Sequence, residues 1–304
     1  MFFVAPGQWD MWKCQGCGSA YLDPRPNERT IGLAYENYYT HARAVSPTAE
    51  TSLQRFRNLF GNDYRNATYK TRYSPSLPGG RFVTMLARAI KRRIDTEFRF
   101  LPSRAGIPKR VLDIGCGNGS FLNFARDAGW QAVGVEPDPA AREVAHAAGF
   151  DVRPALSDWP DDESFGYVTL CHVIEHVHDP RLYVQDAFDR LAPGGRIYIE
   201  TPNIDARGHE VYGPAWRGLE PPRHLVLFNR SSLLRLIDEA GFRHPCFIAR
   251  PEVADALAGE SRKIAAITNG PYAHAVSRRT SNARFTNGDC ADDEFLTVMA
   301  EKPR

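Results

Sequence analysis

The segment VLDIGCGNGS, residues 111–120, carries the clearest chemical signal in the 304-residue sequence. Three glycines alternate in it, directly after an apolar run typical of a buried strand and directly before a helix-like run. Glycine adopts positive φ and lets backbone N–H groups approach a ligand closely. A strand-to-helix turn of this kind lies at the ligand-binding edge of a doubly wound sheet. We therefore predict a cofactor-binding turn made of Gly115, Cys116, Gly117, Asn118 and Gly119.

Two carboxylates near the turn indicate the kind of ligand. The turn has the spacing G-x-G-x-G, whereas a dinucleotide fingerprint has G-x-G-x-x-G and binds a pyrophosphate. Asp113 lies two residues before the first glycine, where its charge favours an ammonium group over a phosphate. Glu136 ends the next strand, at the position of an acid that binds ribose hydroxyls, with a surface turn acid as the alternative. S-adenosylmethionine has an ammonium, a sulfonium and a ribose but no phosphate, so we predict it as the cofactor.

Three of the nine histidines are candidates for a catalytic base. Methyl transfer to a hydroxyl or amine needs a group that takes the acceptor's proton, and the pKa of histidine suits this task near neutral pH. His224, in a loop after the fifth strand, is the first candidate, and His172, at the end of the fourth strand, is the second. His176 follows on the next segment, where it could equally hold the loop by hydrogen bonds. The i, i+4 pair does not supply the ligands of a tetrahedral metal site, so we predict no metal.

Cys14 and Cys17 form a CxxC motif typical of one half of a zinc ribbon. A structural zinc site needs four ligands, and the other four cysteines fall in the α/β domain predicted below. Only 13 residues precede Cys14. We therefore expect no zinc, and either a lost ribbon or a late start codon. A redox role is disfavoured because the helix of a thioredoxin-like setting is missing.

From Lys109 onward, strand-like and helix-like segments alternate. Strands are predicted at 110–114, 131–136, 165–171, 195–201, around 244–250 and at 294–302, and helices at 121–129, 138–149, 179–191 and 231–241. Asp138, Asp179 and Ser231 are the expected helix N-caps. The alternation predicts an α/β fold with a mostly parallel sheet and helices on both faces. Residues 251–292 are expected to form a loop or an irregular helix.

The sequence before this domain, which we place at 106–304, divides into an arm and a helical cap. Proline density predicts an extended arm over residues 1–45, with a short helix between Glu28 and Tyr38. In the cap, residues 46–105, the first part is polar and poorly periodic. Apolar residues then recur at helical spacing at Phe82, Met85, Leu86, Ala89, Ile90 and Ile94. We expect this amphipathic helix to pack over a neighbouring site, with a membrane surface as the alternative.

The net charge of +2 is unevenly distributed, because residues 1–105 carry +8 and the remainder −6. A basic front part can attract an anionic substrate or lipid headgroups, although a solvated basic face is the simpler interpretation. No apolar run approaches the roughly 20 residues of a membrane span, and the N-terminus lacks the features of a secretory signal. Scattered cysteines suit a reducing compartment. We expect a cytoplasmic protein with no transmembrane segment and at most weak contact with a membrane surface.

The motifs, taken together, resemble those of a known family. VLDIGCGNGSFL, GVEPD, SFGYVTLCHVIEHVHDP, LAPGGRIYIETPN and PPRHLVLFNRSSLLRLIDEAGF occur in order over about residues 106–245. They look like class I S-adenosylmethionine-dependent methyltransferases, in the branch of ubiquinone-pathway O-methyltransferase-like proteins and enzymes from bacterial surface-polysaccharide clusters. The resemblance implies a Rossmann-like, seven-stranded sheet with an antiparallel final strand.

The resemblance also implies roles for single residues. Asp113 and the turn would hold the methionine end of the cofactor, and Glu136 its ribose. Ala155 stands where relatives often carry an acid that binds adenine, and Gly166 where they tend to have aspartate. The predicted cofactor contacts outside the turn are Asp113, Glu136, Pro137, Ala155, Leu156, Cys171 and His172.

These features predict an O-methyltransferase for a small or sugar-containing acceptor, such as a nucleotide- or lipid-linked glycan, with an anionic acceptor among the options. The loop over residues 203–225 would close on the acceptor, which Trp216, Arg217, Glu220 and Arg223 could grip. A quinone or phenol is the alternative acceptor, and a non-catalytic scaffold the alternative function. The glycine spacing disfavours a nicotinamide dehydrogenase. We expect no nucleic-acid partner, since the sequence has no Asn-Pro-Pro-Tyr-like motif and no basic–aromatic module. The methylated atom and the oligomeric state stay open.

Overall fold

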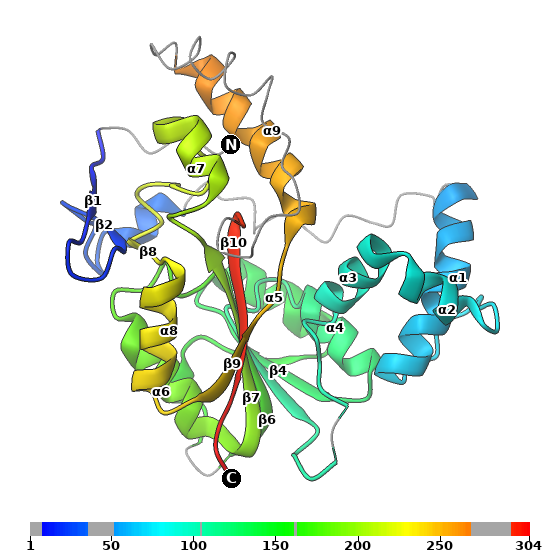
Figure 1. Cartoon of the computed structure of the whole chain (residues 1–304). Helices are drawn as coiled ribbons and strands as arrows, with labels where there is room; N and C mark the ends of the chain where they lie inside the picture. Colours follow the sequence, from blue (N-terminus) through cyan, green and yellow to red (C-terminus); the bar gives the residue numbers. More distant parts are fainter. Residues whose placement is uncertain (1–7, 36–51, 104, 161–162, 269–292) are drawn as a thin grey trace. The chain divides into compact units, whose positions relative to one another are not determined.

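The computed structural model describes residues 8–35, 52–103, 105–160, 163–268 and 293–304 (Figure 1). They belong to two compact units. Unit 1 lies within residues 1–39, 170–189 and 197–303, and unit 2 lies within residues 40–169 and 190–196, with Arg304.

A seven-stranded sheet forms the core of the fold. Its strands are β3 (Arg110–Ile114), β4 (Gln131–Val135), β5 (Asp151–Arg153), β6 (Phe165–Cys171), β7 (Leu191–Pro202), β9 (Arg243–Phe247) and β10 (Phe295–Glu301), in the order β5-β4-β3-β6-β7-β10-β9. β3 pairs in parallel with β4, and β4 with β5, whereas β10 runs antiparallel to β9. The predicted α/β class, the mostly parallel sheet and its antiparallel final strand are confirmed.

Helices follow the strands as the sequence predicts. In unit 2, α4 (Ser120–Asp127) packs on β3 and β4, and α5 (Pro139–Ala147) packs on β5. Asp138 caps α5 by accepting a hydrogen bond from the Ala140 amide at 2.8 Å. Asp179 likewise accepts from the Arg181 amide at the start of α6 (Pro180–Arg190).

The expected serine cap of α8 (Arg230–Glu239) is wrong, because Asn229 is the N-cap. Its side-chain oxygen accepts from the Ser232 amide at 2.8 Å, and the Ser232 hydroxyl accepts from the Asn229 amide at 3.0 Å. This reciprocal pair satisfies two backbone donors, which makes Asn229 the better start of the helix.

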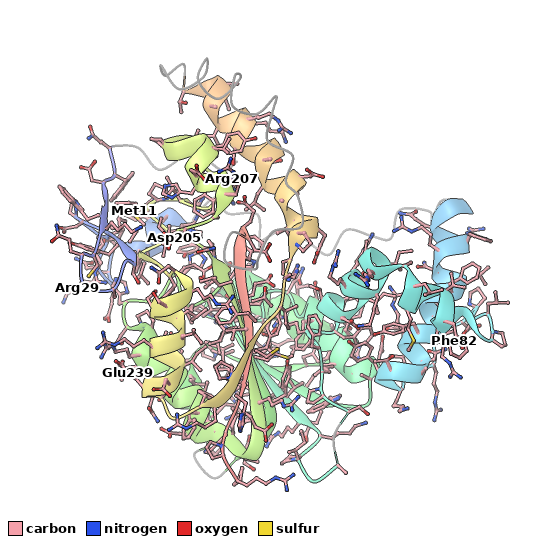
Figure 2. All side chains as sticks on the ribbon, in the orientation of Figure 1. Met11, Arg29, Phe82, Asp205, Arg207 and Glu239 are labelled. Carbon is pink, nitrogen blue, oxygen red and sulfur yellow. The ribbon has the colours of Figure 1, made fainter. Side chains whose placement is uncertain are left out.

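The cap consists of three helices in unit 2: α1 (Ser52–Tyr69), α2 (Gly80–Leu86) and α3 (Arg88–Glu97). The amphipathic helix predicted over 82–94 is therefore wrong in its continuity, because Ala87 leaves the helical region with φ −82° and ψ 73°. α1 arises in the part that looked poorly periodic. Phe82, labelled in Figure 2, lies on α2 and is 59% exposed, and the packing of this part over a site stays a prediction.

The arm is not simply extended. β1 (Met11–Lys13) and β2 (Ala20–Leu22) pair antiparallel, and β2 also pairs with β8 (Val226–Leu227) to give a three-stranded sheet. The alternation of buried Ala20 and Leu22 with exposed Tyr21 explains why this segment forms a strand. A 3₁₀ turn at Ile31–Ala34 replaces the short helix, whose predicted end at Tyr38 lies outside the described residues, as does the 45/46 boundary.

The segment expected to be loop or irregular helix contains a regular helix, α9 (Ala254–Ile267), after the 3₁₀ turn Pro251–Val253. Residues 269–292 lie outside the described part. α9 contacts α7 (Arg207–Tyr212), which the 3₁₀ turn Gly213–Ala215 follows. Another 3₁₀ turn, Leu156–Asp158, follows β5. None of the described helices is long and apolar enough to cross a membrane.

Candidate functional site

The glycine turn of unit 2 follows β3 directly and has the backbone that its sequence predicts. Gly115, Gly117 and Gly119 have φ values of 73°, 55° and 81°. Other residues are strained in this region, so the three glycines are required by the course of the chain. The Gly115 amide donates to the Val135 carbonyl at 2.7 Å, which fixes the turn to the end of β4.

Glu136, the predicted ribose ligand, is tied to the same turn. Its Oε2 accepts from the Gly117 amide at 2.8 Å, and its Oε1 accepts from the Asp138 amide at 2.9 Å. Burial raises the pKa of Glu136, against the opposing effect of these two amides. Each carboxylate oxygen has further acceptor capacity, so Glu136 can hold the turn and still accept bonds from a diol.

Asp113 is fully buried and faces a cation of the protein itself. Its Oδ1 accepts from the Arg99 guanidinium and, at 2.7 Å, from the Thr169 hydroxyl. Burial raises the pKa of Asp113, while Arg99 opposes this rise. Oδ2 has no hydrogen-bond partner among the described residues. Asp113 is therefore already paired, which the sequence did not indicate, because Arg99 precedes the domain and has no motif around it.

The turn is open at its second glycine. A Cβ added at Gly117 would meet nothing within 4 Å. Cys116, in contrast, packs back against β4, since a Cβ at Gly134 would lie 2.5 Å from its sulfur. The open approach at Gly117 and the remaining acceptor capacity of Glu136 suit the donor groups of S-adenosylmethionine, whereas both oxygens of Asp113 are buried. The Asn118 side chain accepts a hydrogen bond from the Ser120 amide, which stabilises the turn at the start of α4.

The loop expected to flank adenine follows β5 and is held from two sides. Ala155 is exposed, and its amide donates to Asp158 Oδ2 at 3.0 Å. Leu156 is buried, and its carbonyl accepts from Arg190 at 3.0 Å. The same guanidinium also donates to the Trp159 carbonyl. Sequence reasoning missed Arg190 as the residue that fastens this loop. Pro137 is exposed beside Glu136.

Cys171 and His172, the remaining predicted cofactor contacts, belong to unit 1. His172 has a φ of 55°, and its ring lies between two buried carboxylates: Nδ1 is 3.3 Å from Glu175 and Nε2 is 3.4 Å from Glu200. Burial alone would lower the pKa of His172, but Cys171 and the two carboxylates raise it well above its usual value. This shift favours the charged form of the ring, so His172, whose side chain is 39% exposed, is poorly suited to accept a proton.

A second cluster in unit 1 combines Glu175, His176 and His224. One ligand atom from each lies within 4.8 Å of the others, so the three groups could hold a metal ion. The sequence offered His172, His176 and His178 with Cys171 as candidate ligands, and of these only His176 belongs to this cluster, to which His224 comes from a distant loop. Nδ1 of His224 contacts the Gly218 carbonyl at 2.8 Å, and burial lowers the pKa of His224 to about 4. The absence of a metal stays a prediction.

Loop residues expected to grip the acceptor are engaged with one another. Glu220 accepts from Arg217 and, at 2.8 Å, from Arg223. Trp216 is 1% exposed and donates to Glu294 Oε2 at 2.7 Å. These side chains stabilise the loop that carries His224.

Residues of the arm contact the histidine cluster and the loops that carry it. The Tyr35 hydroxyl lies 2.9 Å from Nδ1 of His176, and Arg223 donates to the Ala34 carbonyl at 3.2 Å. His178 contacts the Pro26 carbonyl at 2.9 Å. No local pattern in the sequence links the arm to these histidines, so this role was missed.

The CxxC motif lies in the turn between β1 and β2. The Cys14 amide donates to the Ser19 carbonyl at 2.7 Å, and both thiols are partly exposed. Hydrogen bonds with Ser19 lower the pKa of Cys17. The expectation of no zinc stays a prediction.

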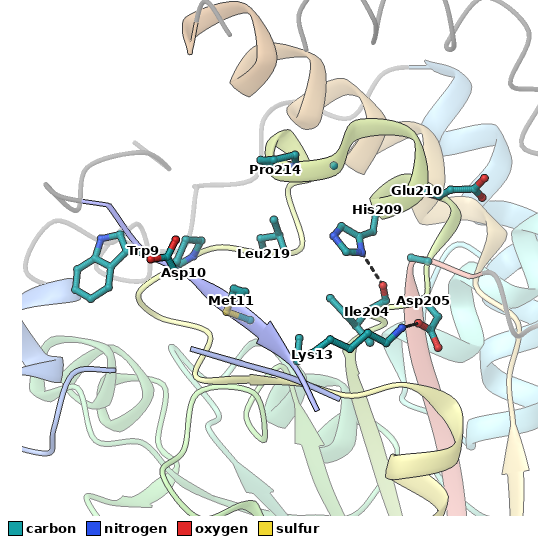
Figure 3. A pocket seen from close by; sticks show the side chains of 14 residues that line it. Trp9, Asp10, Met11, Lys13, Ile204, Asp205, His209, Glu210, Pro214 and Leu219 are labelled. Atoms are coloured by element: carbon teal, nitrogen blue, oxygen red, sulfur yellow. Dashed lines mark hydrogen bonds and ion pairs between the residues drawn. The ribbon is translucent and has the colours of Figure 1, made fainter. Parts of the chain in front are cut away.

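Unit 1 also contains a pocket of about 690 Å³ (Figure 3). Met11, Ile204 and Leu219 give it an apolar wall, and its polar lining is Asp10, Lys13, Asp205, His209 and Glu210. Lys13 pairs with Asp205 at 3.1 Å. The indole nitrogen of Trp9, another lining residue, is buried without a hydrogen-bond partner among the described residues. No local pattern predicts this pocket, because its residues come from the arm and the 204–221 loop.

An α/β sheet whose glycine turn is tied to an acid at the end of the next strand defines a nucleoside-binding domain. A family model described as a methyltransferase domain matches residues 86–244, more than half of the sequence. The chain belongs to this family, that of the class I S-adenosylmethionine-dependent methyltransferases, as its motifs predicted.

Three relatives illustrate the similarity. The chain is 32% identical over 155 residues to norajmaline N-methyltransferase of Rauvolfia serpentina, covering 46% of the chain and 51% of that protein. It is 29% identical over 149 residues to ubiquinone biosynthesis O-methyltransferase of Idiomarina loihiensis. This match covers 43% of the chain and 60% of that protein. It is 30% identical over 157 residues to a probable S-adenosylmethionine-dependent methyltransferase of Mycolicibacterium smegmatis, covering 50% and 58%. The matched region thus spans between half and three fifths of these relatives.

Proposed function

We propose that the protein transfers the methyl group of S-adenosylmethionine to a hydroxyl group of a small, sugar-containing acceptor. One observation carries the cofactor half of this proposal: Glu136 binds the Gly117 amide directly beside open space at that glycine. A carboxylate in this place can accept both ribose hydroxyls while the amides of the turn face the ligand. The chemistry supplied by the bound cofactor is an activated methyl group.

The pocket of unit 1 supports a polar acceptor. Asp10, Asp205 and Glu210 place three carboxylates in its lining against the single ammonium of Lys13, which favours a neutral, hydroxyl-rich molecule over an anion. Trp9 also lines the pocket, and its ring offers a large, rigid contact surface to a bound molecule. A quinone or phenol would leave most of these polar groups unpaired. The link to surface polysaccharides rests on the family branch alone.

His176 is the base that this geometry favours. The two carboxylates beside His172 raise its pKa, which disfavours it as a base, and His224 has only 5% of its side chain exposed. His176 keeps 18% of its side chain exposed, and its Nε2 lies 3.9 Å from Glu175. A partly exposed imidazole beside a buried carboxylate can take a proton and be stabilised as it becomes charged. His224 and Glu175 then act as positioning residues.

Transfer of labelled methyl groups tests the proposal. The purified full chain is incubated with methyl-labelled S-adenosylmethionine and a panel of sugar nucleotides, glycolipids and phenols. We expect label in a hydroxyl-bearing sugar acceptor, and loss of most turnover in His176→Gln with unchanged affinity for S-adenosylhomocysteine. Label only in phenols would overturn the acceptor assignment. Cofactor binding without any transfer would favour the scaffold alternative.

A further inference from the structure

The outward face of α2 is made of large apolar side chains. Phe82, Val83, Met85 and Leu86 have exposed fractions of 59%, 51%, 48% and 85%, and we call these four residues the α2 patch. At about 100° per residue, they cover one side of the helix, opposite Gly80. The apolar stripe of an ordinary surface helix faces the core. In α2 the large apolar side chains instead face outward.

The orientation of α2 is fixed by its packing against α1. Gly80 and Thr84 are its buried residues, and a Cβ at Gly80 would lie 2.8 Å from the Cα of Phe60. Asp63 of α1 accepts a hydrogen bond from the Arg81 amide at 2.9 Å. The missing side chain at Gly80 lets the backbones of α1 and α2 approach closely in the orientation in which the apolar side of α2 faces away from α1.

Positive charge borders the α2 patch. Residues 70–94 contain seven lysines and arginines and no acid. Arg81, Arg88 and Arg93 are exposed, and the Arg81 guanidinium lies 5.1 Å from the centre of the Phe82 ring.

The nearest acid is Asp63 of α1, which accepts from the Arg81 amide, and the next two acids are engaged by other side chains. Asp95 is 2% exposed and accepts from Lys91, Tyr64 and Tyr69. Glu97 accepts from Arg65 and Arg93. Apolar side chains flanked by basic ones are the composition of a helix that lies in a membrane interface.

We propose that α2 docks the protein onto an anionic phospholipid membrane. The α2 patch enters the boundary between headgroups and acyl chains, and Arg81 and Arg88 bind lipid phosphates. A second copy of the chain is disfavoured as the occupant of this face, because it would bring two basic segments of the same sign together. The proposal is independent of the identity of the methyl acceptor.

Vesicle sedimentation tests the docking. The full chain is mixed with vesicles of phosphatidylcholine, with or without phosphatidylglycerol, and bound protein is measured against lipid concentration. We expect binding to the anionic vesicles that weakens with added salt. The variant Phe82→Ser/Leu86→Ser should bind at least about tenfold more weakly, since each substitution removes a large apolar side chain from the interface. Leu182→Ser/Ile267→Ser is the matched control, because these residues are 60% and 65% exposed on other helices.

Calorimetry with S-adenosylhomocysteine checks that each variant keeps the fold. No binding by the unmodified chain, or equal binding by the α2 variant and the control, would overturn the proposal. Self-association that the α2 variant abolishes, without vesicle binding, would assign the face to a second copy and would also overturn it. Vesicle binding without affinity for S-adenosylhomocysteine would sink the methyltransferase proposal and leave the docking proposal standing.

Discussion

Replacing Arg99 with methionine would isolate one buried cation beside the cofactor-binding turn. In the structure, Asp113 is 0% exposed, and Arg99 is the only cation that the described part of the chain places against it. Methionine keeps much of the apolar stem of arginine but removes the charge and the hydrogen bond. The Thr169 hydroxyl then remains as the partner of Asp113.

The expected cost is large. Removing one partner of a buried ion pair leaves an uncompensated charge and typically costs about 3–5 kcal/mol. The surface pair Arg93–Glu97 provides the control, because Arg93 has 69% of its side chain exposed. Arg93→Met should lower the free energy of unfolding by less than about 1 kcal/mol.

The loss should depend on pH in a defined direction. Burial raises the pKa of Asp113, and Arg99 opposes that rise, so the variant raises the pKa further. A carboxyl with a raised pKa in the folded state favours folding at acid pH, where it is protonated, and disfavours it as the pH rises past its ordinary range. The stability deficit of Arg99→Met should therefore be small at acid pH and fully developed at neutral pH.

Urea unfolding of the single variants and of Arg99→Met/Asp113→Asn, repeated at acid and neutral pH, measures these losses in the free energy of unfolding. We expect the second substitution to recover much of the stability lost in Arg99→Met, since it removes the unpaired charge. Equal deficits for Arg99→Met and Arg93→Met, or a deficit that does not change with pH, would refute a buried charge pair at the turn.

Three further predictions concern other side chains. Glu136→Gln should weaken binding of S-adenosylhomocysteine roughly tenfold to a hundredfold, because hydrogen bonds to a charged acceptor contribute about 1.5–3 kcal/mol; calorimetry measures this, and unchanged affinity would contradict the ribose role. The raised pKa of His172 gives a stabilisation that is complete below the ordinary histidine pKa and is lost as the pH rises through the folded value. Urea titrations from neutral to alkaline pH should show this decline in the free energy of unfolding for the parent chain and not for His172→Gln. Identical profiles would argue against a charged His172 held between Glu175 and Glu200. Asp10→Asn removes one carboxylate from the lining of the pocket and should raise KM for the acceptor several-fold at constant affinity for the cofactor, whereas an unchanged KM would place the acceptor elsewhere.

The sequence was sufficient for features that depend on neighbouring residues. Strand and helix alternation gave the sheet and its helices, and Asp138 and Asp179 were correct caps because capping is a local interaction. The glycine turn and Glu136 were also predictable, since their spacing reflects one strand–turn–helix unit. Asn229 was missed in favour of Ser231 because both residue types cap well, and only the structure shows which one starts the helix.

Features that join distant segments could not be predicted. Arg99 reaches Asp113 from the end of the cap, Tyr35 reaches His176 from the arm, and neither has a periodic or spaced signal. Single-sequence patterns report burial along one element, not the partner that two elements share. The same limit applies to α2, whose apolar residues predicted packing although the helix turns Gly80 and Thr84 inward.

The most direct test of the nucleoside site is a calorimetric titration of the full chain with S-adenosylhomocysteine and, separately, with NAD. One molecule of S-adenosylhomocysteine per chain should bind, more weakly in Glu136→Gln, and NAD should not bind. Binding of NAD, or no heat of binding from S-adenosylhomocysteine, would contradict a turn built for a phosphate-free nucleoside.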